Sequence, residues 1–198
     1  GKTKWVSRIG GKFDGYGATS IEETTQGHLL IGGFHGKNKF QERVLLKLNA
    51  TSGNLIWIKH YPNDGFGAIE GVEEVNNGDI IMTGYINGTQ ENGFLSMDSE
   101  GIIMKTNSEG ELIWEKKIID EDSHFKIPSG MRIIEDKING DYMISSTVYK
   151  EDTIYKDYGL SITEIAEPNL WVYAYVGIKD EHCYVKKLSL DGGYLLTG

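Results

Sequence analysis

The chain has 198 residues, with 20 Lys and Arg against 29 Asp and Glu, so its formal net charge is -9 at pH 7. That acidity, without a long cluster of basic residues, excludes a nucleic-acid partner. A hydrophobic fraction of 39% suits a folded protein, and no apolar run reaches the roughly 20 residues of a membrane-spanning helix. The single cysteine, Cys183, excludes an internal disulfide.

Short apolar runs alternate with turns rich in Gly and Asn, which predicts β-strands and no helix. In chain order, the strands of the first unit are predicted at 18–25, 28–34, 44–49 and 54–60. Those of the second unit are predicted at 68–75, 79–85, 102–106 and 111–117. A third unit follows with strands at 130–135, 141–148, 158–163 and around Trp171, and two last strands are predicted at 183–188 and 194–197.

All four tryptophans occupy one position of this repeat, 52, 57 and 57 residues apart: Trp5, Trp57, Trp114 and Trp171. Repeats of this length, built from short strands and glycine-rich turns, are typical of β-propeller blades. Two interpretations of the indoles are open, a ring of aromatic ligand sites or packing between neighbouring blades. Their even spacing favours packing, with each N–H bonded to a carbonyl.

The predicted fold is an all-β, single-domain β-propeller with four-stranded antiparallel blades over 1–198. Its blade units are about 1–60, 61–117 and 118–174, with a partial unit at 175–198. An outermost strand at Trp5, twelve strands and a final pair make fifteen strands, one fewer than a closed four-bladed ring. We therefore expect about three and a half blades of a larger propeller. The alternative is a ring or fibre completed by a strand from another chain.

Two stretches carry a family resemblance. Residues 47–57 resemble the tryptophan-docking motif of pyrroloquinoline-quinone-type propellers, and residues 5–14 and 190–198 look like the repeats of secreted bacterial β-propeller proteins. The resemblance implies a propeller of about seven or eight blades and an extracellular or envelope setting, without implying an enzyme. Asn49 stands where the motif has Asp, and Cys183 alone cannot supply the Cys-Cys pair of quinoprotein dehydrogenases, so their active site is not carried over.

Four aspartates follow the tryptophans by seven to nine residues: Asp14, Asp64, Asp122 and Asp180. Each lies in the loop that leads from the outer strand of one blade to the inner strand of the next, where the central channel opens. A ring of carboxylates there is a candidate Ca²⁺ site. The favoured alternative is that each carboxylate accepts backbone N–H bonds within its own loop, because no calcium-loop pattern is present. No other cofactor is expected.

Two N-glycosylation sequons begin at Asn49 and Asn87, both in predicted turns or loops. They favour an extracellular or cell-surface location, whereas the single cysteine leans mildly towards a reducing compartment. The histidines form no His-x-His or His-x-x-x-His pair, so a zinc site has no support from spacing. The repeated Glu22-Glu23 and Glu73-Glu74 pairs are interpreted as solvated charges.

These patterns predict a non-catalytic, secreted or cell-surface β-propeller that serves as a structural and protein-interaction module. We expect it to be glycosylated and to assemble with a protein partner or with itself. The alternative is a propeller enzyme, such as a hydrolase, lyase or quinoprotein-like enzyme, with its site at the channel mouth. A metal or cofactor beside Asp14 and Asp64 would favour the enzyme.

Overall fold

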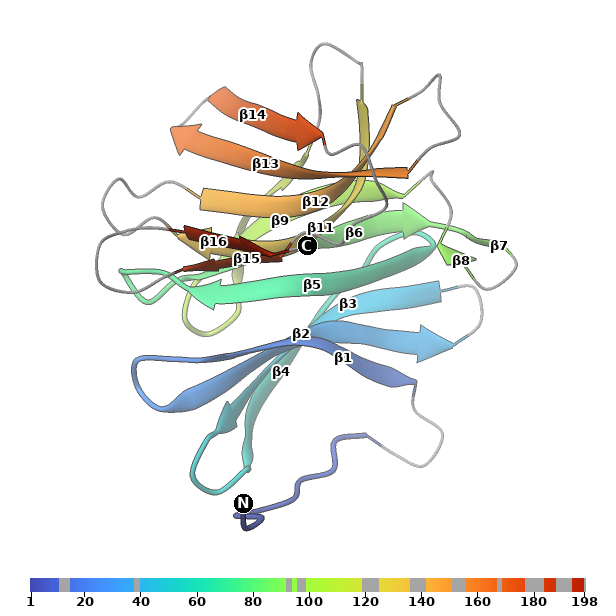
Figure 1. The fold of residues 1–198 in the computed structure, drawn as a ribbon. Helices are drawn as coiled ribbons and strands as arrows, with labels where there is room; N and C mark the ends of the chain where they lie inside the picture. Colours follow the sequence, from blue (N-terminus) through green and yellow to red (C-terminus); the bar gives the residue numbers. More distant parts are fainter. Residues whose placement is uncertain are drawn as a thin grey trace.

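The computed structural model describes residues 1–10, 15–37, 40–91, 94–95, 99–118, 125–135, 142–150, 156–166, 169–176, 184–187 and 194–197 (Figure 1). These residues form β-strands and no helix, so the predicted all-β class is confirmed. Within this described part, no helix has the length and apolar character needed to cross a bilayer.

The strands pair in chain order into three antiparallel sheets of four strands. Sheet 1 contains β1 (Tyr16–Glu23), β2 (His28–Lys37), β3 (Phe40–Asn49) and β4 (Leu55–Tyr61). Sheet 2 contains β5 (Phe66–Glu74), β6 (Ile80–Gly88), β9 (Glu100–Thr106) and β10 (Leu112–Lys117). Sheet 3 contains β11 (Phe125–Glu135), β12 (Tyr142–Lys150), β13 (Lys156–Ala166) and β14 (Asn169–Val176). Two short pairs complete the strands: β7 (Gln90–Glu91) with β8 (Phe94–Leu95), and β15 (Tyr184–Lys187) with β16 (Tyr194–Thr197).

Three segments differ from the predicted strand pattern. The stretch 86–101, which falls between the strands predicted at 79–85 and 102–106, contains the end of β6, the β7–β8 pair and the start of β9. β11 begins at Phe125, before the start of the strand predicted at 130–135. Residues 1–9 form no strand, although an outermost strand was expected at Trp5. This segment is instead held by side chains, because the Trp5 indole N–H donates to the carbonyl of Ala50 at 2.8 Å.

The hydrophobic core lies in two layers between the sheets, because alternate residues of a strand point to opposite faces. Met82 of β6 packs towards sheet 1, and its neighbour Ile81 packs towards sheet 3. The layer between sheets 1 and 2 includes Leu30, Leu45, Ile69, Val72, Ile80, Met82, Ile102 and Met104. The layer between sheets 2 and 3 includes Val75, Ile81, Ile103, Ile118, Ile133, Tyr142 and Ile144.

The first strands of successive units lie next to one another. β1 contacts β5, β5 contacts β11, and β11 contacts β15. In sheet 3 the later strands β12, β13 and β14 lie successively farther from β5, as Figure 1 shows. The arrangement brings charged residues from separate sheets to one place, at the ends of β1, β5 and β11.

Candidate functional site

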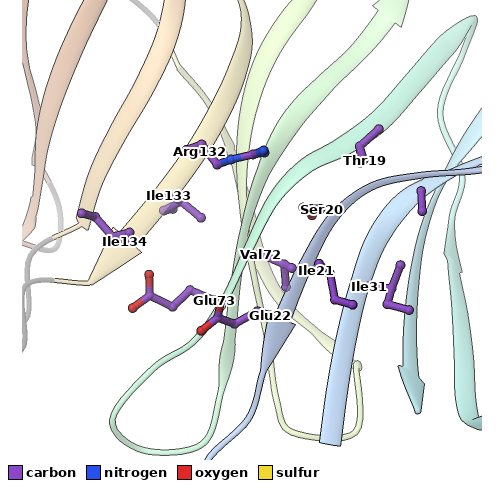
Figure 2. Close-up of a pocket in the computed structure, with 11 residues that line it drawn as sticks. Thr19, Ser20, Ile21, Glu22, Ile31, Val72, Glu73, Arg132, Ile133 and Ile134 are labelled. Carbon is purple, nitrogen blue, oxygen red and sulfur yellow. The ribbon is translucent and has the colours of Figure 1, made fainter. Parts of the chain in front are cut away.

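A cavity of about 620 Å³ opens between β1, β5 and β11. Three charged residues line it, each from a different strand: Glu22 on β1, Glu73 on β5 and Arg132 on β11. Figure 2 shows the two glutamates gathered at one end and Arg132 towards the other, with apolar side chains such as Val72 between them. The two glutamates, interpreted from the sequence as solvated charges, therefore line a shared cavity.

A partly buried polar cluster lies beside this cavity. The Arg132 guanidinium donates from Nη1 to the backbone carbonyl of Glu70 at 2.6 Å. Burial raises the pKa of Glu70 above its ordinary value, and the charge of Arg132 offsets part of that rise. Burial, with the Glu70 charge as a smaller cause, also raises the pKa of Tyr85 to about 12. The cluster therefore favours a neutral Glu70 more than water would.

Asp64, the one predicted metal ligand among the described residues, does not line this cavity. Asp64 precedes the start of β5, whereas the cavity is lined by Val72 and Glu73 near the end of the same strand. Asp64 is exposed and forms no group with other metal-ligating side chains among the described residues. The other three predicted ligands, Asp14, Asp122 and Asp180, lie outside the described residues.

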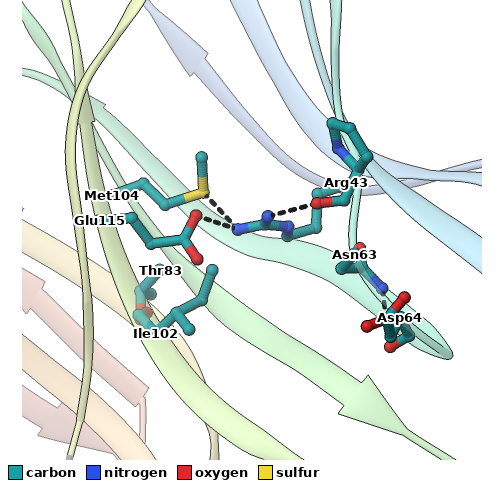
Figure 3. Close-up of polar contacts among 8 residues, drawn as sticks. Arg43, Asn63, Asp64, Thr83, Ile102, Met104 and Glu115 are labelled. Carbon is teal, nitrogen blue, oxygen red and sulfur yellow. Dashed lines mark hydrogen bonds and ion pairs between the residues drawn. The ribbon is translucent and has the colours of Figure 1, made fainter.

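A second charged group joins sheets 1 and 2 (Figure 3). Arg43 on β3 is only 4% exposed, and its Nη1 lies 2.6 Å from Oε2 of Glu115 on β10. The same guanidinium donates to the carbonyl of Pro62 at 3.1 Å and contacts the Met104 sulfur at 3.0 Å. Both Nη atoms are engaged by neighbouring parts of the fold, and Nε is buried without a partner. Arg43 therefore acts as an inter-sheet contact and presents little to a ligand.

Two of the tryptophans, Trp5 and Trp57, each contact a glycine turn. A Cβ on Gly53 would clash with the Trp5 ring, and a Cβ on Gly110 would lie 3.1 Å from Cη2 of Trp57. Trp57 and Trp114 pack against the two core layers, one layer each. The Trp5 N–H is bonded, while the Trp57 N–H is buried without a partner. The side chain of Trp171, on β14, lies outside the described residues.

The two sequon asparagines differ in their surroundings. Oδ1 of Asn49 accepts the backbone N–H groups of Thr51 and Ser52 at 3.0 and 2.9 Å, so this side chain holds its own turn. Asn87 is exposed, with a φ of 56°, and its Nδ2 donates to Oε2 of Glu100 at 2.6 Å. Glycosylation of either residue stays a prediction.

One group of side chains in sheet 1 has metal-ligating chemistry: His35, Glu42 and His60. His60 Nδ1 lies 3.0 Å from Oε2 of Glu42, and His35 Nδ1 lies 4.0 Å from the same oxygen. The sequence spacing gave no sign of this group, because its members come from three strands. The signal that could have found it is the β2–β3 pairing, in which His35 stands opposite Glu42.

Comparison with known proteins gives no family assignment: no protein-family model matches the chain, and no curated protein matches it in sequence.

Proposed function

We propose that this protein is a β-propeller that serves as a structural and protein-interaction module, and that its interaction surface is the outer face of sheet 1. The face in question points away from sheet 2 and carries Ile21, Leu29 and Ile31. Support for blades comes from the three successive four-stranded sheets, whose first strands adjoin one another. An extracellular or cell-surface setting rests on the sequons and the family resemblance.

The observation that carries the proposal is an equivalence between sheets. The strand registers pair Ile21 with Ile31 in sheet 1, Val72 with Met82 in sheet 2, and Ile133 with Ile144 in sheet 3. The residues of sheets 2 and 3 are buried by the neighbouring sheet, with exposed fractions of 7% or less: Val72, Met82, Ile133 and Ile144. Ile21, by contrast, is 62% exposed, beside an open cavity of about 290 Å³. Sheet 1 thus presents the packing positions of the repeat without the sheet that covers them elsewhere.

A repeated polar contact supports the same conclusion. Glu74 in sheet 2 accepts the backbone N–H of Thr25, from the β1–β2 turn of sheet 1, at 2.7 Å. Glu135 in sheet 3 accepts the backbone N–H of Asn76, from the β5–β6 turn of sheet 2, at 3.0 Å. The register places Glu23 at the matching position of sheet 1, where it is exposed. Glu23 is therefore positioned to accept an N–H from a sheet that would pack on this face.

At the outer part of this face, the N-terminal segment already makes a contact of the kind that a packed sheet would make. Trp5 lies on the Gly53 turn as Trp57 lies on the Gly110 turn, and Ser7 Oγ donates to the carbonyl of Gly53 at 2.5 Å. Trp57 belongs to β4, the outermost strand of sheet 1. Residues 5–9 therefore occupy the place that an outermost strand of a preceding sheet would take.

The occupant that we assign to this face is a second copy of the chain. The face matches the packing face of the repeat's own sheets, and the partner sheet that we assign is the β15–β16 sheet of the second copy. Packing of that sheet of one copy onto sheet 1 of the next is a head-to-tail contact. Such contacts build rings or fibres.

The test is the mass of the purified chain in solution by light scattering after size exclusion. We expect assemblies larger than the 22.1 kDa chain, and Ile21→Lys should reduce them to single chains. Ile113→Lys is the matched control, because Ile113 is 52% exposed but lies on β10, away from this face. A chain that stays monomeric at high concentration, or one that Ile113→Lys disrupts equally, would overturn the proposal.

The cavity between β1, β5 and β11 favours a second candidate function, a ligand or enzyme site near the axis. Two carboxylates at one end and apolar walls suit a small organic amine. Ligand-observed NMR with small primary amines tests this candidate. Saturation transfer should weaken in Glu73→Gln and persist in Glu100→Gln, and no transfer in the wild-type protein would count against it.

A further inference from the structure

The His35, Glu42 and His60 side chains converge at one end of sheet 1, on the face that carries Ile31. One ligand atom from each residue lies within 4.8 Å of the other two. The three residues come from β2, β3 and β4, so neighbouring strands of one hydrogen-bonded sheet hold them. Their spacing is thus fixed by strand pairing and not by a single loop.

An aromatic side chain holds the imidazoles in place. Tyr16 on β1 stacks on the His35 ring with centroids 4.1 Å apart, and its hydroxyl lies 3.5 Å from Nε2 of His60. The strand register places Tyr16 directly opposite His35. Both histidines therefore have restrained ring orientations, and each has its Nδ1 near the Glu42 carboxylate.

The matching positions of sheet 2 show what is unusual here. The pair Ile86 and Glu100 of sheet 2 matches the pair His35 and Glu42 of sheet 1. Lys117 of sheet 2 occupies the position that His60 has in sheet 1. In sheet 2 the Lys117 ammonium lies 2.6 Å from the Glu100 carboxylate. A cation thus neutralises this carboxylate in sheet 2. In sheet 1 an imidazole stands at each of these two positions, His35 in place of the aliphatic side chain and His60 in place of the ammonium.

We propose that His35, Glu42 and His60 bind a divalent transition-metal ion, with Zn²⁺ as the best match. Zn²⁺ takes imidazole nitrogen and carboxylate oxygen at about 2.0–2.2 Å, which places tetrahedral ligand atoms about 3.4 Å apart. The distances from the Glu42 oxygen to the two Nδ1 atoms, 3.0 and 4.0 Å, lie on either side of that value. With three protein ligands, the fourth coordination position is left to water. Tyr16 is the residue that positions His60.

The side chains' exposure allows the ion to enter. His35 is 32% exposed, Glu42 46% and His60 34%, so the ligand atoms are reached from solvent without opening the sheet. Metal binding to imidazole requires a free ring nitrogen lone pair, so protons compete with the ion for this site. The site does not depend on the proposed self-assembly, and it can be measured on the Ile21→Lys chain.

The test is calorimetric titration of the chelator-treated protein with Zn²⁺, together with Co²⁺ absorption spectra. We expect one ion per chain and the visible bands of tetrahedral Co²⁺. His60→Lys should weaken binding by more than about 100-fold, because it replaces a ligand by the cation found in sheet 2. Tyr16→Phe, which keeps the stacking and loses the hydroxyl, should weaken binding by about 10-fold. Glu100→Gln is the matched control and should change nothing.

The His60→Lys variant should still fold, because the matching position of sheet 2 accommodates a Glu–Lys pair. A second variant, Glu42→Gln, should lose binding while its thermal unfolding without metal stays close to that of the wild type. Absence of Zn²⁺ binding, or binding that His60→Lys and Glu42→Gln leave unchanged, would overturn the proposal. The second result would place the ion elsewhere and leave these residues as a cross-strand hydrogen-bonded group only.

Discussion

The indole of Trp57 lies against Gly110, on the turn that joins β9 to β10 in the neighbouring sheet. The contact is reinforced by Tyr61, whose hydroxyl donates to the Gly110 carbonyl at 2.9 Å, and by the ion pair of Lys59 with Glu111. Three alternate residues of the outer strand β4, Trp57, Lys59 and Tyr61, thus contact one turn of sheet 2. Sheets 1 and 2 are joined at their outer edge by this turn.

Replacing Gly110 by Ala tests the contact. Gly110 has a φ of 76°, and a Cβ there would lie 2.7 Å from Cγ of Lys59 and 3.1 Å from Cη2 of Trp57. The matched control is Gly78→Ala, at a φ of 83° with open space around the new Cβ. Both substitutions should lower the free energy of unfolding by about 1 kcal/mol, because alanine is strained in the left-handed backbone conformation. Gly110→Ala should lose a further 1–3 kcal/mol or so by overpacking, measured by urea unfolding. Equal losses in the two variants would contradict the account.

The buried Arg43 should contribute far more to stability than an exposed cation. Arg43→Met leaves the Glu115 carboxylate without its guanidinium and should destabilise the fold by about 3 kcal/mol. Lys59→Met removes an ion pair whose Glu111 partner is 66% exposed, and should cost less than about 1 kcal/mol. Urea unfolding of both variants measures the difference. If Lys59→Met destabilised the fold as much as Arg43→Met or more, the inter-sheet cluster around Arg43 would contribute little to stability.

The repeated glutamate contact predicts unequal effects of equal substitutions. Glu74→Ala removes the acceptor of the Thr25 N–H and should cost about 1 kcal/mol. Glu23→Ala, at the matching position of sheet 1, should leave the stability of the single chain unchanged. Unfolding at protein concentrations low enough to prevent association measures both. If Glu23→Ala destabilised the single chain as much as Glu74→Ala, the equivalence between the two positions would fail.

Glu70 and Glu100 should give stability profiles of opposite slope with pH. Burial raises the pKa of Glu70, so its contribution is fully present below the ordinary pKa of about 4.3 and is lost as the pH rises through the folded pKa. The hydrogen bond from Lys117 is the main cause that lowers the pKa of Glu100, so its contribution is present above about pH 4.3 and is lost as the pH falls through the folded pKa.

The matching experiment measures unfolding free energy against pH for Glu70→Gln and Glu100→Gln. Glu70→Gln should be more stable than the wild type at neutral pH, with the gain disappearing below about pH 4. Glu100→Gln should be slightly less stable than the wild type at neutral pH and equal to it in acid. Identical pH profiles for the two variants would contradict the surroundings assigned to both carboxylates.

The strands of sheets 1 and 2 were predictable because their signals are local. Apolar residues alternate along β6 between its two core faces, and turns such as Asn77-Gly78 need the positive φ that glycine allows. The extra β7–β8 pair and the early start of β11 were not predictable. Both lie in polar stretches where strand formation depends on neighbours that the sequence does not identify.

The sites were less accessible to sequence reasoning, because they arise between strands and between sheets. His35, Glu42 and His60 share no spacing pattern, and strand register alone brings them together. Glu22 and Glu73 were recognised as a repeat, but their common cavity requires β1 and β5 to adjoin.

The exposed position of Ile21 is the most direct test of the central claim that sheet 1 receives a sheet from another copy. In a chain whose own cysteine is replaced, Cys183→Ala, the variants Ile21→Cys and Ile113→Cys are labelled with a maleimide over a range of protein concentrations. The account predicts that position 21 becomes protected as the concentration rises, while position 113 reacts at a constant rate. A labelling rate at position 21 that does not depend on concentration would contradict it.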